Sequence, residues 1–151
     1  MAIANEAVRQ ARFTGDREQL LGARVRRAQV LQFQGKLFEA ITELSGCVDE
    51  ARSRDWTALE AFAIQNRGKA HFDAQEYEAA LADVTAAVFL REKLGASPAE
   101  IESSLIAVAV VKSFADAQQA AAGGGAGAGN GDDAERRSDS NRDGAGDEHQ
   151  A

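Results

Sequence analysis

Two apolar patterns on either side of a short polar break constrain the fold of this chain more than any other feature. From Ala61 to Leu90, small and apolar residues recur at spacings of three and four, which is typical of one buried face on each of two helices. The break between them, DAQE at 73–76, is too short and too polar for anything but a tight turn. The pattern therefore predicts two antiparallel helices that pack along a shared apolar seam.

A second hairpin of the same kind precedes this one by 40 residues. Four small or apolar positions match in one register, and the pairs are Ala28 and Gly68, Ala40 and Ala80, Leu44 and Val84, and Cys47 and Ala87. A glycine in the middle of a helix costs about 1 kcal/mol relative to alanine. We therefore expect another helix to approach closely at Gly68, and we interpret the two hairpins as an internal repeat.

The composition favours an all-α protein that does not contact a membrane. Aromatic residues make up 6% of the chain, there is one proline, and no segment alternates Val, Ile and Thr as a strand does. Cys47 is the only cysteine, which excludes a disulfide framework within the chain. The longest apolar run, 105–111, is far below the ~20 residues of a membrane span. The N-terminus lacks the pattern of a secretory leader, so we expect a cytoplasmic location.

Start and stop signals predict six helices within a helical domain at 1–120. Their expected ranges are about 2–13, 17–34, 37–53, 56–74, 77–94 and 98–119. Capping boxes are expected at two starts, with Asp16 paired to Gln19 and Ser97 paired to Glu100. Gly35 and Gly95 are natural stops.

Two further local expectations concern single residues in this helical domain. Asp55 is expected to cap the helix at 56–74. In the first helix, the inward side chains are expected to be Ile3, Ala7, Val8 and Ala11.

The composition changes abruptly after Ala120. Residues 121–151 contain no apolar side chain larger than alanine, so they cannot offset the entropy that ordering would cost. We therefore predict a disordered tail rich in Gly, Ala and Asp at 121–151.

Charge argues against a nucleic-acid partner. The net charge is −7, with an isoelectric point of about 4.9, whereas nucleic-acid-binding domains are normally basic. The exception is the N-terminal part: residues 1–36 carry seven basic and three acidic side chains, a net charge of +4. The Arg-rich region 9–27, with Arg24, Arg26 and Arg27, would support an alternative function as a nucleic-acid-associated regulator.

The two hairpins resemble the tetratricopeptide repeat, whose pattern is W-x2-L-G-x2-Y, then A-x3-F and Pro. The second copy shows it as Ile64, Gly68 and His71, followed by Ala80 and Val84. The first copy departs from it, because Arg24 and Arg27 stand where the family has apolar residues. Both copies lack the closing proline, and their period is longer than the family's ~34 residues. The resemblance covers residues 17–94, and more loosely 2–119.

This resemblance implies a short right-handed α-solenoid whose first helices line a concave groove for another protein or a peptide. The groove side would then carry Val25, Arg26, Gln29, Phe33, Gln65, Asn66, Lys69, Phe72 and Asp73. Lys69 and Asp73 stand one turn apart, so a solvated ion pair is the alternative to a binding role for these two residues.

The helix expected at 98–119 has a different pattern from the others. The segment from Leu105 to Val111 is apolar around the whole circumference, and such a helix is buried on more than one side. We expect it to pack inward on helices 56–94 and outward on a second copy or a partner. The residues of this outward face would be Leu105, Ile106, Val108, Val110 and Val111. The alternative is a monomer whose N-terminal helix covers the other end.

A non-catalytic adaptor, scaffold or regulatory protein without cofactor or metal is the leading functional prediction. A small enzyme that uses Cys47 and His71 is the alternative from another class. No third group to orient this pair is evident in the sequence, and both residues stand at positions where the repeat requires core packing.

Overall fold

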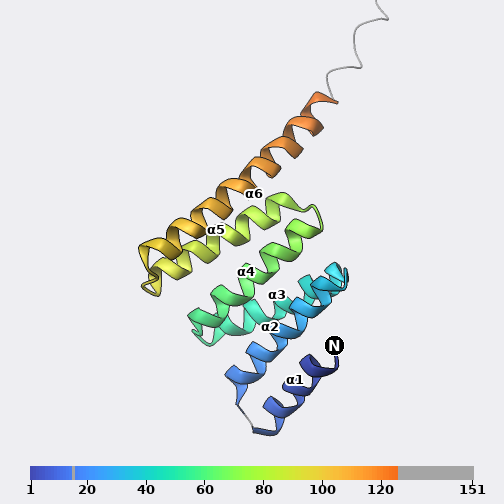
Figure 1. Ribbon diagram of the computed structural model, residues 1–151, viewed down its shortest axis with the longest axis vertical. Helices are drawn as coiled ribbons and strands as arrows, with labels where there is room; N and C mark the ends of the chain where they lie inside the picture. Colours follow the sequence, from blue (N-terminus) through green and yellow to red (C-terminus); the bar gives the residue numbers. More distant parts are fainter. Residues whose placement is uncertain (15, 126–151) are drawn as a thin grey trace, which may run out of the picture. The chain divides into compact units, whose positions relative to one another are not determined.

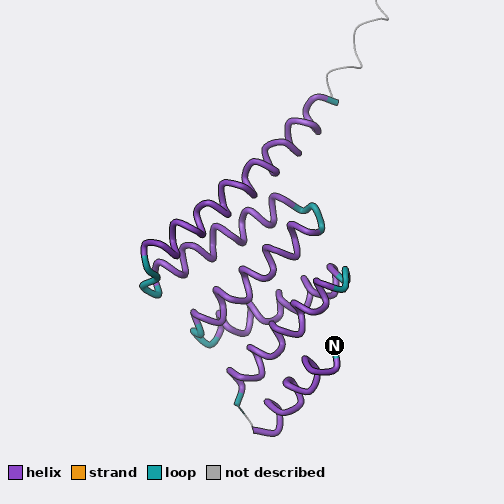
Figure 2. Tube along the Cα trace, viewed as in Figure 1, coloured by secondary structure: helices purple, strands orange, loops and turns teal. Residues whose placement is uncertain are grey.

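The structure, a computed structural model, describes residues 1–14 and 16–125, and this part of the chain is helical throughout, without strands (Figures 1 and 2). Its helices are α1 (Ala2–Thr14), α2 (Arg17–Phe33), α3 (Leu37–Ser53), α4 (Thr57–Asp73), α5 (Tyr77–Lys93) and α6 (Pro98–Gly124). The chain divides into two compact units, residues 1–118 and 119–151. The prediction of an all-α fold is confirmed for the described residues.

Helix α6 differs most from its expected range, because it ends at Gly124 and not near 119. The residues that extend it include three alanines at 120–122, and alanine has the highest helix propensity of all residues. The first four residues of the predicted tail are therefore helical. Residues 126–151, where most of that tail was predicted, lie outside the described residues.

The internal repeat has a shorter unit than the sequence suggested. Helices α2 to α5 are each 17 residues long, and they begin 20 residues apart. Two residues after the end of each helix stands a residue with a positive φ, and these are Gly35 (76°), Asp55 (56°), Gln75 (60°) and Gly95 (79°). In each turn the next N–H group donates to a carbonyl five residues back, as in Lys36 to Leu31 at 2.9 Å, which closes a Schellman motif. The 40-residue repeat is therefore two helix-plus-turn units of the same length.

Most of the predicted helix signals are confirmed, with one correction. The Asp16 carboxylate accepts from the Gln19 N–H at 3.0 Å, and Glu100 accepts from the Ser97 N–H at 2.8 Å. This backbone hydrogen bond lowers the pKa of Glu100. Asp55 does not cap α4: it holds the left-handed position after α3, and Trp56 precedes α4 without a side-chain cap.

The core lies between successive antiparallel helices. Its largest fully buried side chains come from α2, α3 and α4, and they include Val25, Leu44 and Ile64. Helices α4 and α5 approach most closely at Gly68, where a β-carbon would lie 3.1 Å from Cβ of Asp83 and 3.2 Å from Cγ1 of Val84. The expected close approach at Gly68 is confirmed, because a β-carbon there would crowd the side chains of Asp83 and Val84.

Helix α1 packs against α2 through a narrower face than expected. Val8 is buried, but Ile3 is 89% exposed, which contradicts the prediction that it points inward. Residues five apart lie roughly 140° apart around a helix, so one neighbouring helix cannot cover both. Among the described residues, no helix is long and apolar enough to cross a membrane.

Candidate binding groove

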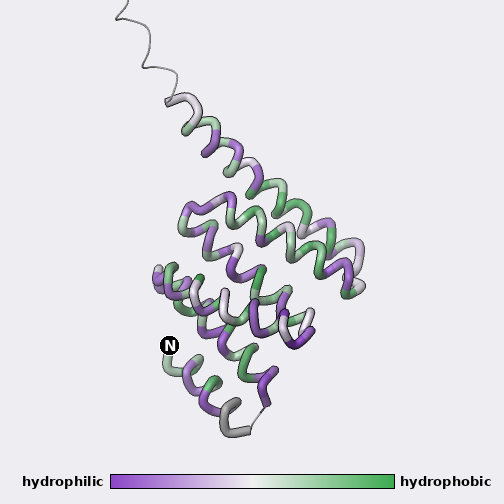
Figure 3. The backbone as a smooth tube through the Cα atoms, turned by 180° about the vertical axis from the view of Figure 1, so that it is seen from behind, coloured by the Kyte–Doolittle hydropathy of each residue, from purple (hydrophilic) through white to green (hydrophobic). Residues whose placement is uncertain are grey.

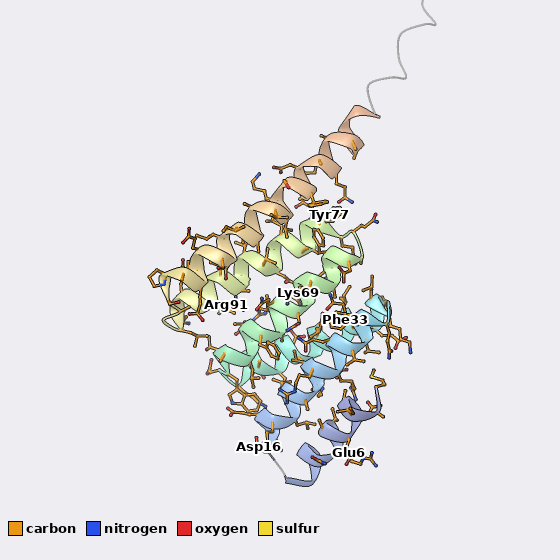
Figure 4. The ribbon with its side chains drawn as sticks, viewed as in Figure 1. Glu6, Asp16, Phe33, Lys69, Tyr77 and Arg91 are labelled. Carbon is orange, nitrogen blue, oxygen red and sulfur yellow. The ribbon has the colours of Figure 1, made fainter. Side chains whose placement is uncertain are left out.

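Residues of α2, α4 and α6 surround a cavity of about 590 Å³, and Phe33 and Lys69 in its lining are labelled in Figure 4. Seven of the nine residues predicted for a groove line it, namely Gln29, Phe33, Gln65, Asn66, Lys69, Phe72 and Asp73. The lining also includes Gln32, Gly68, Val84, Ala107, Val110 and Val111. We call this cavity the groove.

The other two predicted groove residues lie elsewhere. Val25 is completely buried and belongs to the core that α2 shares with α3 and α4, so it cannot reach a ligand. Arg26 is exposed, but its guanidinium folds back along α2 to Gly22, about 3.5 Å from where a β-carbon would stand. Helix α2 is covered on more sides than the repeat pattern implied, because α1, α3 and α4 all pack against it.

Side-chain amides join α2 to α4 along the groove. Gln29 donates to Oδ1 of Asn66 at 2.8 Å, and the buried Asn66 amide donates in turn to the Phe62 carbonyl at 2.8 Å. Gln32 donates to the Asp73 carboxylate at 2.8 Å. Asp73 therefore has its hydrogen-bond partner across the groove, and a Lys69–Asp73 ion pair is not among those formed by the described residues. These bonds hold the polar wall of the groove in one arrangement.

The opposite wall of the groove is apolar. Val110 and Val111 face it from α6, and Val84 of α5 reaches it beside Gly68. At the rim, the Phe33 side chain is 88% exposed, which is unusual for a large apolar residue. The groove thus combines amide donors and acceptors with an apolar surface that is open to solvent.

Helix α6 packs against α4 and α5 through side-chain contacts near both ends of the groove. Phe114 packs against Phe72 and Tyr77, with ring centroids 5.1 and 5.2 Å away. Near the start of α6, Arg91 of α5 donates to the Ser104 hydroxyl at 3.1 Å and also contacts Gln65 of α4. Both Tyr77 and Arg91 are labelled in Figure 4. Because these contacts fix α6, they also set the width of the groove.

The apolar segment of α6 does not form one common outward face. Val111 is buried and Val108 is half-buried, while Val110 and Val111 both line the groove. Leu105 and Ile106 are exposed, at 51% and 61%. The hydrophobic run in the middle of α6 is visible in Figure 3. Val110 is also exposed, at 48%, although it lines the groove. The predicted partner face is therefore divided between residues that pack, residues that line the groove, and Leu105 and Ile106, which do neither.

Ion pairs between the helices of each hairpin were not predicted. Arg27 contacts Glu43 at 2.8 Å, and Arg67 contacts Asp83 through two hydrogen bonds of 2.8 Å. The pairs are 40 residues apart, so the alignment of the two copies contained this signal. Burial disfavours the charge on Glu43, but the hydrogen bond and charge of Arg24, together with Arg27, outweigh it and lower the pKa of Glu43.

These ion pairs also bear on the nucleic-acid alternative. Arg24 contacts Glu43 at 2.9 Å and Glu50 at 3.0 Å, while Arg27 shares Glu43. Two of the three arginines in the predicted basic cluster are therefore bound to carboxylates of α3. A phosphate backbone would have to compete with these carboxylates for both guanidinium groups.

Cys47 and His71 have different neighbours. Cys47 is buried, and burial raises the pKa of its thiol to about 11, next to the charges of Arg24 and Glu43. The His71 ring faces acidic side chains instead, with Nε2 3.8 Å from Asp83 and Nδ1 3.5 Å from Glu76. Nδ1 is buried and has no hydrogen-bond partner within the described part of the chain. No group of three metal-binding side chains occurs in residues 1–14 and 16–125.

Comparison with known proteins adds no assignment for the groove. No protein-family model, no curated protein and no solved structure matches this chain. The function of the groove must therefore be inferred from its own geometry.

Proposed function

We propose that this chain is a non-catalytic protein–protein interaction module of the tetratricopeptide type, which holds a peptide or helix of another protein in the groove. The observation that carries this proposal is the groove itself, because seven residues chosen from the repeat register line one open cavity. In this proposal, α2, α4 and α6 are the first helices of successive repeats, and the protein acts as a cytoplasmic adaptor or regulator.

The size and chemistry of the groove fit a short segment better than a whole protein surface. A volume of about 590 Å³ is that of a typical ligand pocket. Amphipathic helices bind by placing an apolar face in a hydrophobic groove, while extended peptides need polar partners for their backbone. The apolar wall with Val110 and the amide wall with Gln29 and Asn66 offer both kinds of contact.

The proposal predicts that the groove selects peptides from a random library. Phage-displayed peptides would be panned on the full chain, and hydrogen exchange of α2 and α4 would then be measured with and without a selected peptide. We expect peptides with apolar anchor residues, and slower exchange at the α2 and α4 residues that line the groove. Peptides that protect only α3 and α5, or a selection without specific binders, would contradict the proposal.

Variants of one polar residue would separate groove binding from a general effect on folding. Lys69 is exposed in the groove, and Lys93 is exposed at the end of α5 outside the lining. We expect Lys69→Glu to weaken binding of the selected peptide by at least about threefold through charge and contact changes, and Lys93→Glu to leave it unchanged. Equal effects of both substitutions would show that net charge matters and the groove does not.

A further inference from the structure

The side of α6 that faces away from the packed helices carries an apolar strip. The less exposed residues of α6 recur at spacings of three and four on one side, namely Ile101, Ser104, Val108, Val111 and Ala115. Leu105, Ile106 and Ala109 lie on other sides and are exposed. We call these three residues the α6 strip. Large apolar side chains that are adjacent and exposed mark an interaction surface more often than isolated ones do.

Residues 126–151 do not offer the side chains of an apolar cover for the strip. Residues 126–151 contain Ala, Gly and polar residues, and no apolar side chain larger than alanine. Burying Leu105 and Ile106 requires apolar side chains on the other surface, because the gain scales with the apolar area removed from water. A second α6 strip provides such side chains.

The charges beside the strip are arranged for self-pairing. Glu102 and Lys112 are both exposed, and each lies five residues from Ala107. Lys112 also contacts Asp116, one turn further along α6, in an exposed ion pair of 2.7 Å. When two α6 helices pair antiparallel about Ala107, Glu102 of each copy faces Lys112 of the other. The same pairing sets Leu105 opposite the small Ala109 of the second copy, which lets the helices approach. A parallel pairing would instead place Glu102 against Glu102.

We propose that the α6 strip binds a second copy of this chain, with the two α6 helices antiparallel around a two-fold axis near Ala107. The contact is isologous, so each copy contributes the same residues and the assembly closes as a dimer. The groove-lining residues Ala107, Val110 and Val111 lie roughly 100° or more around α6 from Leu105 and Ala109, so a seam along Leu105 and Ala109 leaves both grooves open. The dimer would present two grooves, and a ligand with two binding segments would gain affinity by avidity. The proposal stands independently of what the grooves bind.

Sedimentation velocity of the full chain tests the contact. At roughly 50 µM the wild-type chain should sediment as a dimer, in the range of weak specific association. Ile106→Asp should raise the dissociation constant about a hundredfold, because two buried apolar side chains become charged. The matched control is Phe38→Asp, since Phe38 is 83% exposed on α3, and α4 and α5 lie between α3 and α6 (Figure 1). A wild-type monomer at this concentration, or equal effects of both variants, would overturn the proposal.

Charge exchange tests the antiparallel register. Glu102→Lys alone and Lys112→Glu alone should each weaken the dimer about tenfold, because every copy then meets like charges. An equimolar mixture of the two variants should restore association, since each lysine again faces a glutamate. Far-UV circular dichroism should be the same for all variants, because the substituted residues are exposed. Failure of the mixture to recover would exclude the antiparallel pairing about Ala107.

Discussion

The hairpins α2–α3 and α4–α5 have the same backbone plan but achieve it with different residues. Both consist of two 17-residue helices and turns with one positive φ. Both also join an arginine in the first helix to a carboxylate in the second, 16 residues later. The lengths, turns and ion pairs are thus what the repeat preserves, and the residues facing the groove are what varies.

The ion pairs that connect the two helices of each hairpin differ in how deeply they are buried. In α2–α3, Glu43 is shared by Arg24 and Arg27, and these side chains remain about one quarter exposed. In α4–α5, Asp83 is almost completely buried and binds Arg67 in a two-pronged geometry. Such a pair contributes little as a unit, but the loss of one partner leaves an uncompensated charge inside the protein.

The largest predicted effect comes from breaking these two equivalent pairs. Asp83→Ala should lower the free energy of unfolding by about 3 kcal/mol, because Arg67 then loses its carboxylate in a largely buried site. Glu43→Ala should cost only about 1 kcal/mol, because the Glu43 side chain is 23% exposed against 9% for Asp83, and Glu50 still pairs with Arg24. Urea denaturation of both variants checks this order. If Glu43→Ala lowers the free energy of unfolding as much as Asp83→Ala does, the burial of the carboxylate does not determine how much each ion pair matters.

Substitutions at the turn residue of each hairpin should have smaller effects on stability, and the effects should have opposite signs in the two copies. Gly35 and Gln75 are equivalent, and both have a positive φ that favours glycine. Gly35→Ala should therefore destabilise the protein by about 1 kcal/mol, and Gln75→Gly should stabilise it by about 0.5 kcal/mol. The two changes are compared by the midpoint of thermal or urea unfolding. A shift in the same direction for both would show that the turns do not share one conformation.

The loss of stability at acidic pH should reveal the contribution of Glu43, which forms ion pairs between α2 and α3. Because the pKa of Glu43 is lowered in the folded state, its contribution is complete above its ordinary value of 4.5. That contribution is lost as the pH falls through the lowered value, when the carboxylate gains a proton. Glu43→Gln should therefore flatten the fall in melting temperature between about pH 5 and pH 3. Identical profiles for wild type and variant would mean that Glu43 does not stabilise the folded state through its charge.

Local signals made most of the fold predictable, and tertiary packing decided the rest. Asp16, Ser97, Gly35 and Gly95 act within one turn, so the sequence alone placed these helix ends. Gln75 was not recognised as a left-handed turn position, because glutamine rarely adopts a positive φ. Asp55 was not recognised either, because an aspartate before a helix also fits the N-cap pattern.

The groove was predictable to the extent that both copies share one register. Gln65 lines the groove, whereas its equivalent Val25 is buried in the core that α2 shares with α3 and α4. The apolar wall could not be assigned from the sequence. The segment 105–111 of α6 is apolar all round, so its pattern did not show which of its residues line the groove.

Thiol labelling at the equivalent positions 47 and 87 tests whether both are buried, and we expect almost no labelling at either. Cys47 is inaccessible, and its raised pKa of about 11 leaves little thiolate at neutral pH. Native protein should therefore resist iodoacetamide, and Ala87→Cys should be protected as well, because Ala87 is buried in the second copy. Labelling is followed by mass spectrometry, with denatured protein as the positive control. Fast labelling of Cys47 alone would favour the enzyme alternative.

The binding groove is tested most directly by two exposed phenylalanines that differ in position. Phe33 is 88% exposed and lines the groove, while Phe38 is 83% exposed on α3 outside it. The affinity of a library-selected peptide would be measured by calorimetry for Phe33→Asp and Phe38→Asp. We expect Phe33→Asp to weaken binding at least about tenfold, as loss of an aromatic contact does, and Phe38→Asp to leave it unchanged. Unchanged binding by Phe33→Asp, or equal loss in both variants, would contradict a ligand site between α2, α4 and α6.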